Sequence, residues 1–265
     1  MVSGSIELAR DGATATVTLT HPGKLNAMSR AMWRQLRSVF VQLADAPCDL
    51  RCVIVRGQGG QFCAGGDIAE YPAFRFREDG LRDFHEGDVW GGLSAMLACE
   101  LPLIAQIEGH CMGAGMEIAS CCDLRVAGAS ARFGAPIGRL GFPMAPREAQ
   151  LVASAAGELT AREMLLEGAV LDAPLLLARG FLNRVVPDDA VAAEVHARAV
   201  RVAAMAPQAV RLNKRTLLAL KQAIPSTNAS SDAMDRIVSG SYAYADSAEH
   251  REGVAAFLEK RHPHF

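Results

Sequence analysis

Apolar residues follow a strand-like pattern in several short segments of the first half of the chain. Residues 5–10 alternate apolar and polar side chains, and Asp11-Gly12 is typical of a tight turn. Residues 13–20 then place Val17 and Leu19 on one face. This pattern predicts a two-stranded hairpin. Three more segments predict strands, the first of them buried. They cover residues 52–56, 103–107 and 123–127.

Helical spacing of apolar residues appears between these segments and dominates the last part of the chain. Ser29 is a good N-cap for a helix over residues 30–44, in which apolar residues recur on one face. That face carries Trp33, Leu36, Phe40 and Leu43. A charged helical stretch is expected over residues 81–99 and a short helix over 116–120. From residue 145 onward the chain is predicted to be almost entirely helical.

The order of these elements predicts an α/β core followed by helices. We expect the core to cover residues 1–200 and a helical C-terminal region, used for oligomerisation and closure of the binding site, to cover residues 201–265. No linker marks this boundary, and neither a repeat nor a low-complexity segment appears.

Composition places the chain among globular proteins with a large core. Hydrophobic residues make up 50% of its 265 residues and the net charge is −2. A near-neutral chain has no general attraction for nucleic acid or anionic membranes. The seven cysteines are odd in number and form no CxxC pair, which fits a reducing compartment. Residues 1–10 have no signal-peptide pattern, and no apolar run is long enough to span a bilayer, so we expect a cytoplasmic protein.

Two glycine-rich turns are candidates for binding negative charge. Ala64-Gly65-Gly66-Asp67 and Gly113-Ala114-Gly115 each follow a strand and precede a helix. Free N–H groups at a helix start point outward and favour anions. Two such amides that converge on one point would form an oxyanion hole. The alternative is a pair of ordinary tight turns, and neither segment has a nucleotide-binding motif.

Motifs along nearly the whole chain resemble the enoyl-CoA hydratase/isomerase (crotonase) superfamily. Phe62-Cys-Ala-Gly-Gly-Asp-Ile68 resembles its FxAGxDI loop, and residues 109–117 resemble its second glycine-rich segment, which ends in a glutamate. Further matches follow in the family's order. They are residues 122–125, 131–136, 161–168, 183–187 and 251–260.

This resemblance implies a fold, an assembly and a substrate class. The fold is a spiral of ββα units with C-terminal trimerisation helices, and the assembly is a homotrimer or a dimer of trimers. The substrate is an acyl-CoA thioester, as in fatty acid metabolism, so CoA enters with the substrate and no cofactor is needed. Partners do not include nucleic acid or membranes. The Gly66 and Ala114 amides would be the oxyanion donors, with alanine at 114 in place of the family's usual glycine.

The resemblance also implies a set of residues that contact the substrate or its CoA. They are Lys24, Leu25, Ala27, Ala64, Asp67, Ile68, Gly113, Pro136, Ile137, Phe257 and Lys260. Phe257 and Lys260 belong to the last helix, which in the family often reaches the nucleotide end of CoA in a neighbouring subunit.

The resemblance matches Glu117 to one of the two glutamates that family hydratases use for acid–base chemistry. Partial burial would raise its pKa towards the range of a working base. The second glutamate is replaced by Ile137, which cannot transfer a proton. Three outcomes remain open. Glu117 alone would catalyse double-bond isomerisation. With help from Glu148, Asp67 or His85 it would hydrate slowly. Otherwise the pocket performs another reaction of the family, such as thioester hydrolysis or decarboxylation.

Other residues and activities have simpler interpretations. We expect Glu148 to form a surface ion pair with Arg147, and His85 to be exposed to solvent. No HExxH or CxxC spacing indicates a metal site. A non-catalytic or RNA-binding member of the same fold is the alternative from another functional class, and the net charge of −2 disfavours it.

Overall fold

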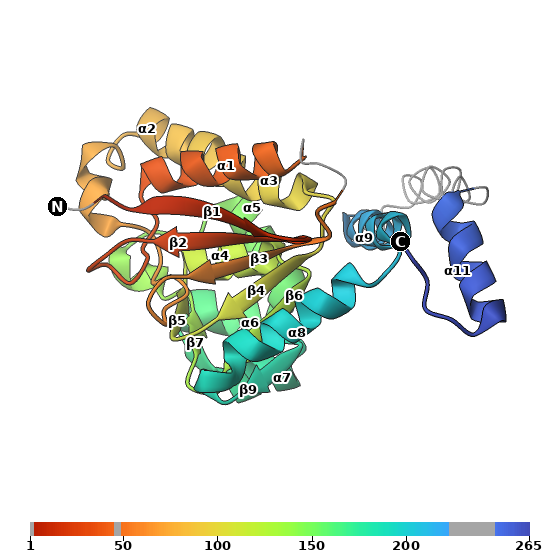
Figure 1. The fold of residues 1–265 in the computed structure, drawn as a ribbon. Coiled ribbons are helices and arrows are strands. Elements are labelled where there is room, and N and C mark those ends of the chain that lie inside the picture. Colours follow the sequence, from red (N-terminus) through yellow and green to blue (C-terminus); the bar gives the residue numbers. More distant parts are fainter. Residues whose placement is uncertain (1–2, 45–48, 223–246) are drawn as a thin grey trace, which may run out of the picture.

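A six-stranded sheet forms the centre of the molecule (Figure 1). The computed structural model describes residues 3–44, 49–222 and 247–265. The strand order is β1-β2-β3-β4-β6-β9. The strands are β1 Ser5–Asp11, β2 Thr14–Thr20, β3 Cys52–Gly57, β4 Leu103–Ile107, β6 Leu124–Gly128 and β9 Arg184–Val186. β1 and β2 form the predicted antiparallel hairpin, and the remaining neighbours pair in parallel.

A smaller sheet of three short strands lies beside the first. Its order is β5-β7-β8, with β5 His110–Met112, β7 Arg132–Gly134 and β8 Val170–Asp172. β8 and β9 correct the prediction that the chain beyond residue 145 is almost entirely helical. Each of these strands has three residues, which is too short to give a recognisable alternating pattern.

Helices connect the parallel strands and cover the sheets. The α-helices are α1 Arg30–Ala44, α2 Glu78–Arg82, α3 Trp90–Ala98, α4 Ala114–Cys121, α5 Pro146–Ala156, α6 Glu158–Arg162, α7 Ala173–Ala178, α8 Val191–Ala203, α9 Pro207–Gln222 and α11 Ala248–Glu259. The 3-10 helices are η1 Ile68–Ala73, η3 Ile137–Leu140 and η5 Asp188–Ala190, and the π-helical turns are η2 Asp83–Val89 and η4 Glu163–Glu167. The helix predicted over 81–99 is therefore interrupted by the π-helical turn η2.

Alternate residues of the central strands bury two separate cores. In β3, Val53 and Val55 belong to the main core, to which α1 contributes its predicted apolar face. Cys52 and Ile54 face the opposite way and pack with Val191 of α8. This period of two is what a strand buried on both faces requires.

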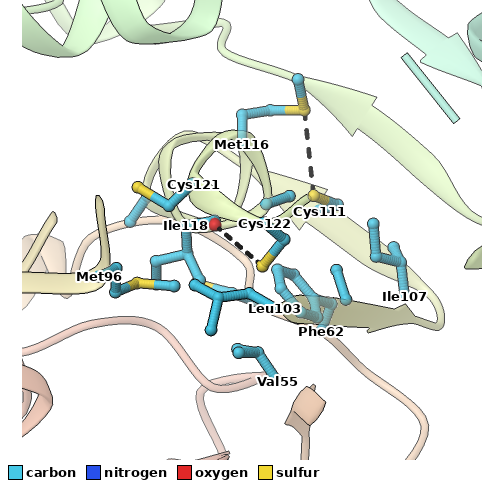
Figure 2. Close-up of a cluster of buried hydrophobic side chains, with 14 of the residues drawn as sticks. Val55, Phe62, Met96, Leu103, Ile107, Cys111, Met116, Ile118, Cys121 and Cys122 are labelled. Carbon is cyan, nitrogen blue, oxygen red and sulfur yellow. Dashed lines mark hydrogen bonds between the residues drawn. The ribbon is translucent and has the colours of Figure 1, made fainter. Parts of the chain in front are cut away.

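A dense apolar cluster supports helix α4 (Figure 2). Ile118 of α4 is fully buried in the main core, as are Leu103 and Ile107 of β4. The Cys122 thiol lies 3.5 Å from the Ile118 carbonyl oxygen. Burial, the largest cause, raises the pKa of Cys122 to about 12, so this thiol is protonated and acts as a small apolar group with a weak donor. The cluster fixes the position of α4, whose first turn contributes to the candidate site.

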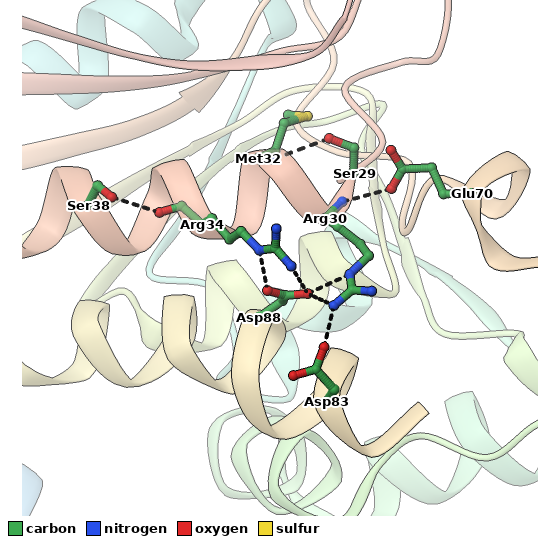
Figure 3. Close-up of polar contacts among 8 residues, drawn as sticks. All are labelled: Ser29, Arg30, Met32, Arg34, Ser38, Glu70, Asp83 and Asp88. Atoms are coloured by element: carbon green, nitrogen blue, oxygen red, sulfur yellow. Dashed lines mark hydrogen bonds and ion pairs between the residues drawn. The ribbon is translucent and has the colours of Figure 1, made fainter. Parts of the chain in front are cut away.

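An ion-pair network joins α1 to the segment that follows the first glycine-rich loop (Figure 3). The buried Asp88 accepts hydrogen bonds from Nε of Arg30 and from Nε of Arg34, both at 2.6 Å. At the start of α1, the backbone N–H of Arg30 donates to Glu70 Oε2 at 2.8 Å. Charge-assisted bonds of this kind are among the stronger contacts in a protein. They hold residues 70–88 against α1.

The C-terminal helices lie to one side of the sheets (Figure 1). α8 runs through residue 200, the predicted boundary, with its buried face against the central sheet. α9 is tied to the core by an ion pair of 2.7 Å between Lys214 and Asp123. Of the described helices, none combines the length and apolarity that crossing a membrane requires.

Candidate active site

The first glycine-rich loop leaves one backbone donor without a protein acceptor. Its neighbours pair with the segment before α1. The Met28 N–H donates to the Gly65 carbonyl oxygen and the Asp67 N–H to the Met28 carbonyl oxygen, both at 2.8 Å. These two bonds involve the residues on either side of Gly66. The Gly66 N–H itself donates to no group in residues 3–44, 49–222 or 247–265. Gly65 has a φ of 118°, which glycine adopts readily.

The second glycine-rich turn starts helix α4 next to the first loop. Gly113, with a φ of 47°, precedes the helix, and Ala114 is its first residue. The first N–H groups of a helix have no intrahelical acceptor, and the Ala114 N–H finds none elsewhere among the described residues. The two turns touch. A Cβ atom built on Gly113 would lie 3.6 Å from Gly65 Cα.

Both turns line one cavity of about 200 Å³. The side chain of Glu117, one helical turn after Gly113, lines it as well. The lining also includes Ile137 of η3, which occupies the position that the sequence matched to a second glutamate. The structure therefore brings Gly66, Ala114 and Glu117 together around a single space.

Glu117 carries an unusual charge state for a glutamate. Burial raises the pKa of Glu117 to about 8, and the negative charge of Glu148 contributes further. Within the described part of the chain, its carboxyl group has no hydrogen-bond partner. A carboxyl group that titrates near neutral pH in a cavity is suited to accepting and returning a proton.

Glu148 and His85 correct two expectations. Glu148 is 2% exposed and accepts a hydrogen bond from His85, whose Nδ1 lies 3.0 Å from Glu148 Oε1. Arg147 pairs instead with Glu86, at 2.9 Å. His85 is largely buried, with its side chain 19% exposed, and it lines the cavity. Adjacent residues of a helix point in different directions, so Arg147 reaches the surface while Glu148 faces the interior.

A second contact assigns the tautomer of His85. Arg75 Nη1 lies 3.4 Å from His85 Nε2. A guanidinium group can only donate, so Nε2 is the acceptor and the ring proton lies on Nδ1, from which it is donated to Glu148. Both ring nitrogens are thus engaged. His85 orients Glu148 rather than presenting a free nitrogen to the cavity.

Tyr71 and Arg75 form part of the cavity wall and were not identified from the sequence. The Tyr71 hydroxyl lies against Gly66, so closely that a Cβ atom on Gly66 would be 2.2 Å from it. Burial, the largest cause, raises the pKa of Tyr71 to about 12, so the phenol is protonated. The Arg75 N–H donates to the Tyr71 carbonyl oxygen at 2.8 Å. Their i, i+4 spacing is the signal that would have placed both side chains on one face.

Several predicted substrate contacts line this cavity, and others support its first loop. Ala64, Ile68, Gly113, Pro136 and Ile137 are lining residues.

Lys24, Leu25 and Asp67 surround the first loop. Lys24 Nζ lies 2.6 Å from Asp67 Oδ2. The Asp67 side chain also accepts a hydrogen bond from the Ala69 N–H, which makes it the N-cap of η1. The Ala64 N–H donates to the Leu25 carbonyl oxygen at 3.0 Å, and Ala27 is 9% exposed.

The last two predicted contacts, Phe257 in α11 and Lys260 just after this helix, are not among the residues that line the described cavity. Lys260 is exposed and follows the end of the helix with a φ of 54°. Phe257 belongs to α11, but its side chain is outside the described residues. Across the described ranges, no cluster of three or more His, Cys, Asp or Glu side chains could hold a metal ion.

Comparisons with known proteins cover nearly the whole chain. A family model described as enoyl-CoA hydratase/isomerase matches residues 9–265. A probable enoyl-CoA hydratase of Mycobacterium bovis is 32% identical over 266 residues, with 100% of this chain and 99% of the relative covered. A mevalonyl-coenzyme A hydratase of Beauveria bassiana is 31% identical over 255 residues, covering 93% and 89%.

Solved structures show the same architecture. An enoyl-CoA hydratase/carnithine racemase from Magnetospirillum magneticum superposes with a TM-score of 0.88 at 39% identity, covering 98% of this chain and 94% of the other. An enoyl-CoA hydratase subunit from Geobacillus kaustophilus gives 0.84 at 30% identity, covering 98% and 97%. The predicted fold class is confirmed.

Proposed function

The chain belongs to the enoyl-CoA hydratase/isomerase (crotonase) superfamily and is an enzyme of that type, and from this premise we propose that it stabilises the enolate of an acyl-CoA thioester, with Glu117 as proton carrier. One observation carries the proposal. Gly66 and Ala114, whose N–H groups have no acceptor among the described residues, line the same cavity as Glu117.

The two amides supply the electrostatic part of the mechanism. Both would donate to the thioester carbonyl oxygen, and their hydrogen bonds strengthen as negative charge develops there. Their positions are fixed before the substrate arrives, because β-bridge pairing holds the Gly66 loop and Gly113 starts α4. Loss of one oxyanion donor typically removes about 2.7–4 kcal/mol of transition-state stabilisation.

Glu117 supplies the proton transfer. Its carboxylate removes a proton from a carbon next to the thioester or its double bond, and the C–H electron pair moves to the carbonyl oxygen as the enolate forms. Return of the same proton to a different carbon completes a double-bond isomerisation without net oxidation or reduction. A carboxyl pKa of about 8 favours both halves of this cycle near neutral pH.

Hydration of an enoyl-CoA is a second candidate, favoured by Glu148. Ile137 removes the family's second glutamate from the cavity wall. However, the negative charge of Glu148 raises the pKa of Glu117, and a hydrogen bond from His85 orients the Glu148 carboxylate. Glu148 is not among the residues that line the cavity, so it would act on the substrate only through its effect on Glu117. Glu117 would then accept the proton from the attacking water and return it to the α-carbon.

The rest of the proposal concerns CoA binding and assembly. Lys24, Leu25 and Ala27 lie beside the first loop, where pantetheine would enter.

We also propose a homotrimer or a dimer of trimers built on the C-terminal helices, with Phe257 and Lys260 approaching the CoA nucleotide of a neighbouring subunit. Exposed apolar side chains on α9 and α11 support such an assembly, including Leu217 at 67% and Leu258 at 73% exposure.

The test is a panel of 2-enoyl-, 3-enoyl- and saturated acyl-CoA substrates incubated in heavy water. Product mass separates isomerisation, hydration and hydrolysis. Glu117→Gln should lower kcat by about 10²–10⁴-fold while acyl-CoA binding persists. Glu167→Gln, a change at an exposed carboxylate, is the matched control. Unchanged turnover in the Glu117 variant would remove this residue from the mechanism.

A further inference from the structure

Arg75 brings a positive charge to the cavity without a carboxylate partner in the part of the chain that the structure describes. Its guanidinium carbon lies 3.7 Å from the ring centre of Phe142 and 4.5 Å from that of Tyr71. The one hydrogen-bond contact of the guanidinium group within the described residues joins Nη1 to His85 Nε2 at 3.4 Å. The aromatic rings hold the guanidinium plane while leaving most of its N–H donors unused.

The guanidinium groups of Arg30 and Arg125 have carboxylate or carbonyl oxygens as acceptors, whereas that of Arg75 has none among the described residues. Arg30 forms ion pairs with Asp83 and Asp88. Arg125 has no carboxylate contact but donates to the carbonyl oxygens of Phe181 and Cys122, each at 2.5 Å. At Arg75, burial lowers the pKa, and Tyr71 is the other group that acts on it. No acidic side chain in the described ranges offsets this charge.

A planar cation with free donors in a cavity is matched to a carboxylate, which accepts two parallel hydrogen bonds from guanidinium. We propose that the cavity selects acyl thioesters whose acyl group carries a free carboxylate in addition to the thioester, and that Arg75 binds this carboxylate. This inference rests on the proposed function, because it places the thioester at Gly66 and Ala114 and the carboxylate further along the same acyl chain.

The position of Arg75 favours the acyl group over the phosphates of CoA. The hydroxyl of Tyr71 lies against Gly66, and Arg75 stacks on the ring of the same tyrosine. One aromatic side chain therefore separates the guanidinium from the oxyanion loop. Arg75 also lines the cavity together with Glu117. The carboxylate of Glu148 is already engaged by His85 and leaves Arg75 free for a ligand.

Calorimetric titration with two pairs of saturated ligands tests the inference. The pairs are glutaryl-CoA with pentanoyl-CoA and adipoyl-CoA with hexanoyl-CoA, each matched in carbon number and differing in the terminal group. In at least one pair the protein should bind the carboxylate ligand about tenfold or more tightly, as expected for charge-assisted hydrogen bonds. Arg75→Met should abolish this preference and leave the affinity for the alkyl ligand within about twofold.

Two further variants make the result specific. Arg77→Met removes an exposed arginine that pairs with Asp79, and it should keep the full preference. Arg75→Lys keeps the charge but not the paired donors, so its preference should fall between those of the wild type and Arg75→Met.

Three results would overturn the inference. The first is the absence of any preference in both ligand pairs. The second is an equal loss of affinity for alkyl and carboxylate ligands in Arg75→Met, which would assign Arg75 to CoA or to structure. The third is failure of the wild type to bind any acyl-CoA, and this result alone would also remove the proposed function.

Discussion

Glu148 lies near enough to Glu117 for its negative charge to add to the burial that raises the pKa of Glu117 to about 8. His85 fixes the orientation of Glu148 through the 3.0 Å hydrogen bond, although Glu148 itself is not part of the cavity lining. Glu117 is thus coupled to a carboxyl group outside the cavity lining, and a substitution at Glu148 can change the pKa of Glu117 without altering a lining residue.

The first prediction concerns the pH dependence of turnover. If Glu117 acts as a base, kcat/KM should rise with pH with an apparent pKa near 8, because the carboxylate form is the active one. Glu148→Gln removes a negative neighbour and should move this rise to lower pH. A pH–rate profile with the variant and with Glu167→Gln as control measures the change. An unshifted profile in Glu148→Gln would show that the two groups are not coupled.

The second prediction concerns the free energy of unfolding. The folded state raises the pKa of Glu117 from 4.5 to about 8, so it binds a proton more tightly than the unfolded chain. Stability should therefore be lost as pH rises from 4.5 to 8. The loss is at most about 1.4 kcal/mol for each unit by which the pKa of Glu117 differs between the folded and unfolded states. Because Glu117 borders an open cavity, we expect less than the full effect. Glu117→Gln should be more stable than the wild type at pH 9 in urea denaturation, and the advantage should shrink by pH 5.

The third prediction concerns the contact between Gly66 and Tyr71. Gly66→Ala would place a Cβ atom 2.2 Å from the Tyr71 hydroxyl and 3.2 Å from its Cζ, so the loop or the ring must shift. The variant should lose at least tenfold in kcat and about 1–3 kcal/mol in stability. Adding Tyr71→Phe to this variant removes the hydroxyl oxygen that the new Cβ meets, and it should restore part of the lost kcat and part of the lost stability.

A double-mutant cycle measures this coupling. Gly138→Ala is the matched control, because its Cβ would meet the Leu165 carbonyl oxygen at an ordinary 3.9 Å. Strict additivity of Gly66→Ala and Tyr71→Phe would contradict the described contact.

The fourth prediction concerns the network around Asp88. Asp88→Asn removes the charge that joins Arg30 and Arg34, and thermal unfolding should register a loss of about 1–3 kcal/mol. KM should rise as well, because Asp88 and His85 belong to the same π-helical turn, η2. Asp83→Asn is the comparison, since Asp83 is 68% exposed and its pair with Arg30 contributes at most about 1 kcal/mol. Equal losses of stability in Asp88→Asn and Asp83→Asn would mean that the buried ion pairs of Asp88 stabilise the fold no more than the exposed pair of Asp83.

Local patterns explain which parts of the fold could be predicted. The hairpin and the apolar face of α1 were correct, because alternation and helical spacing depend on neighbouring residues. The family motifs identified the superfamily, and the structure places Gly66, Ala114 and Glu117 around one cavity. Their roles in catalysis remain predictions.

Contacts between distant segments explain what the sequence did not reveal. Glu148 was assigned to a surface pair because Arg147 precedes it, whereas its partner, His85, lies 63 positions away. Arg75 likewise meets Phe142 from another part of the chain. Strands β8 and β9 depend on pairing with β7 and β6 rather than on a pattern of their own.

The cavity is assembled from two parts of the chain that are held in place by different contacts. Gly66 lies in the first glycine-rich loop, and Ala114 and Glu117 lie in α4; they are fixed by pairing with Met28 and by the cluster beneath α4. Tyr71, Arg75 and His85 come from one continuous segment between the first loop and α3, held against α1 by Glu70 and Asp88. The two parts meet where the Tyr71 hydroxyl lies against Gly66. Substitutions at Arg75 or His85 can therefore reshape one wall of the cavity while the contacts that fix Gly66 and Glu117 stay in place.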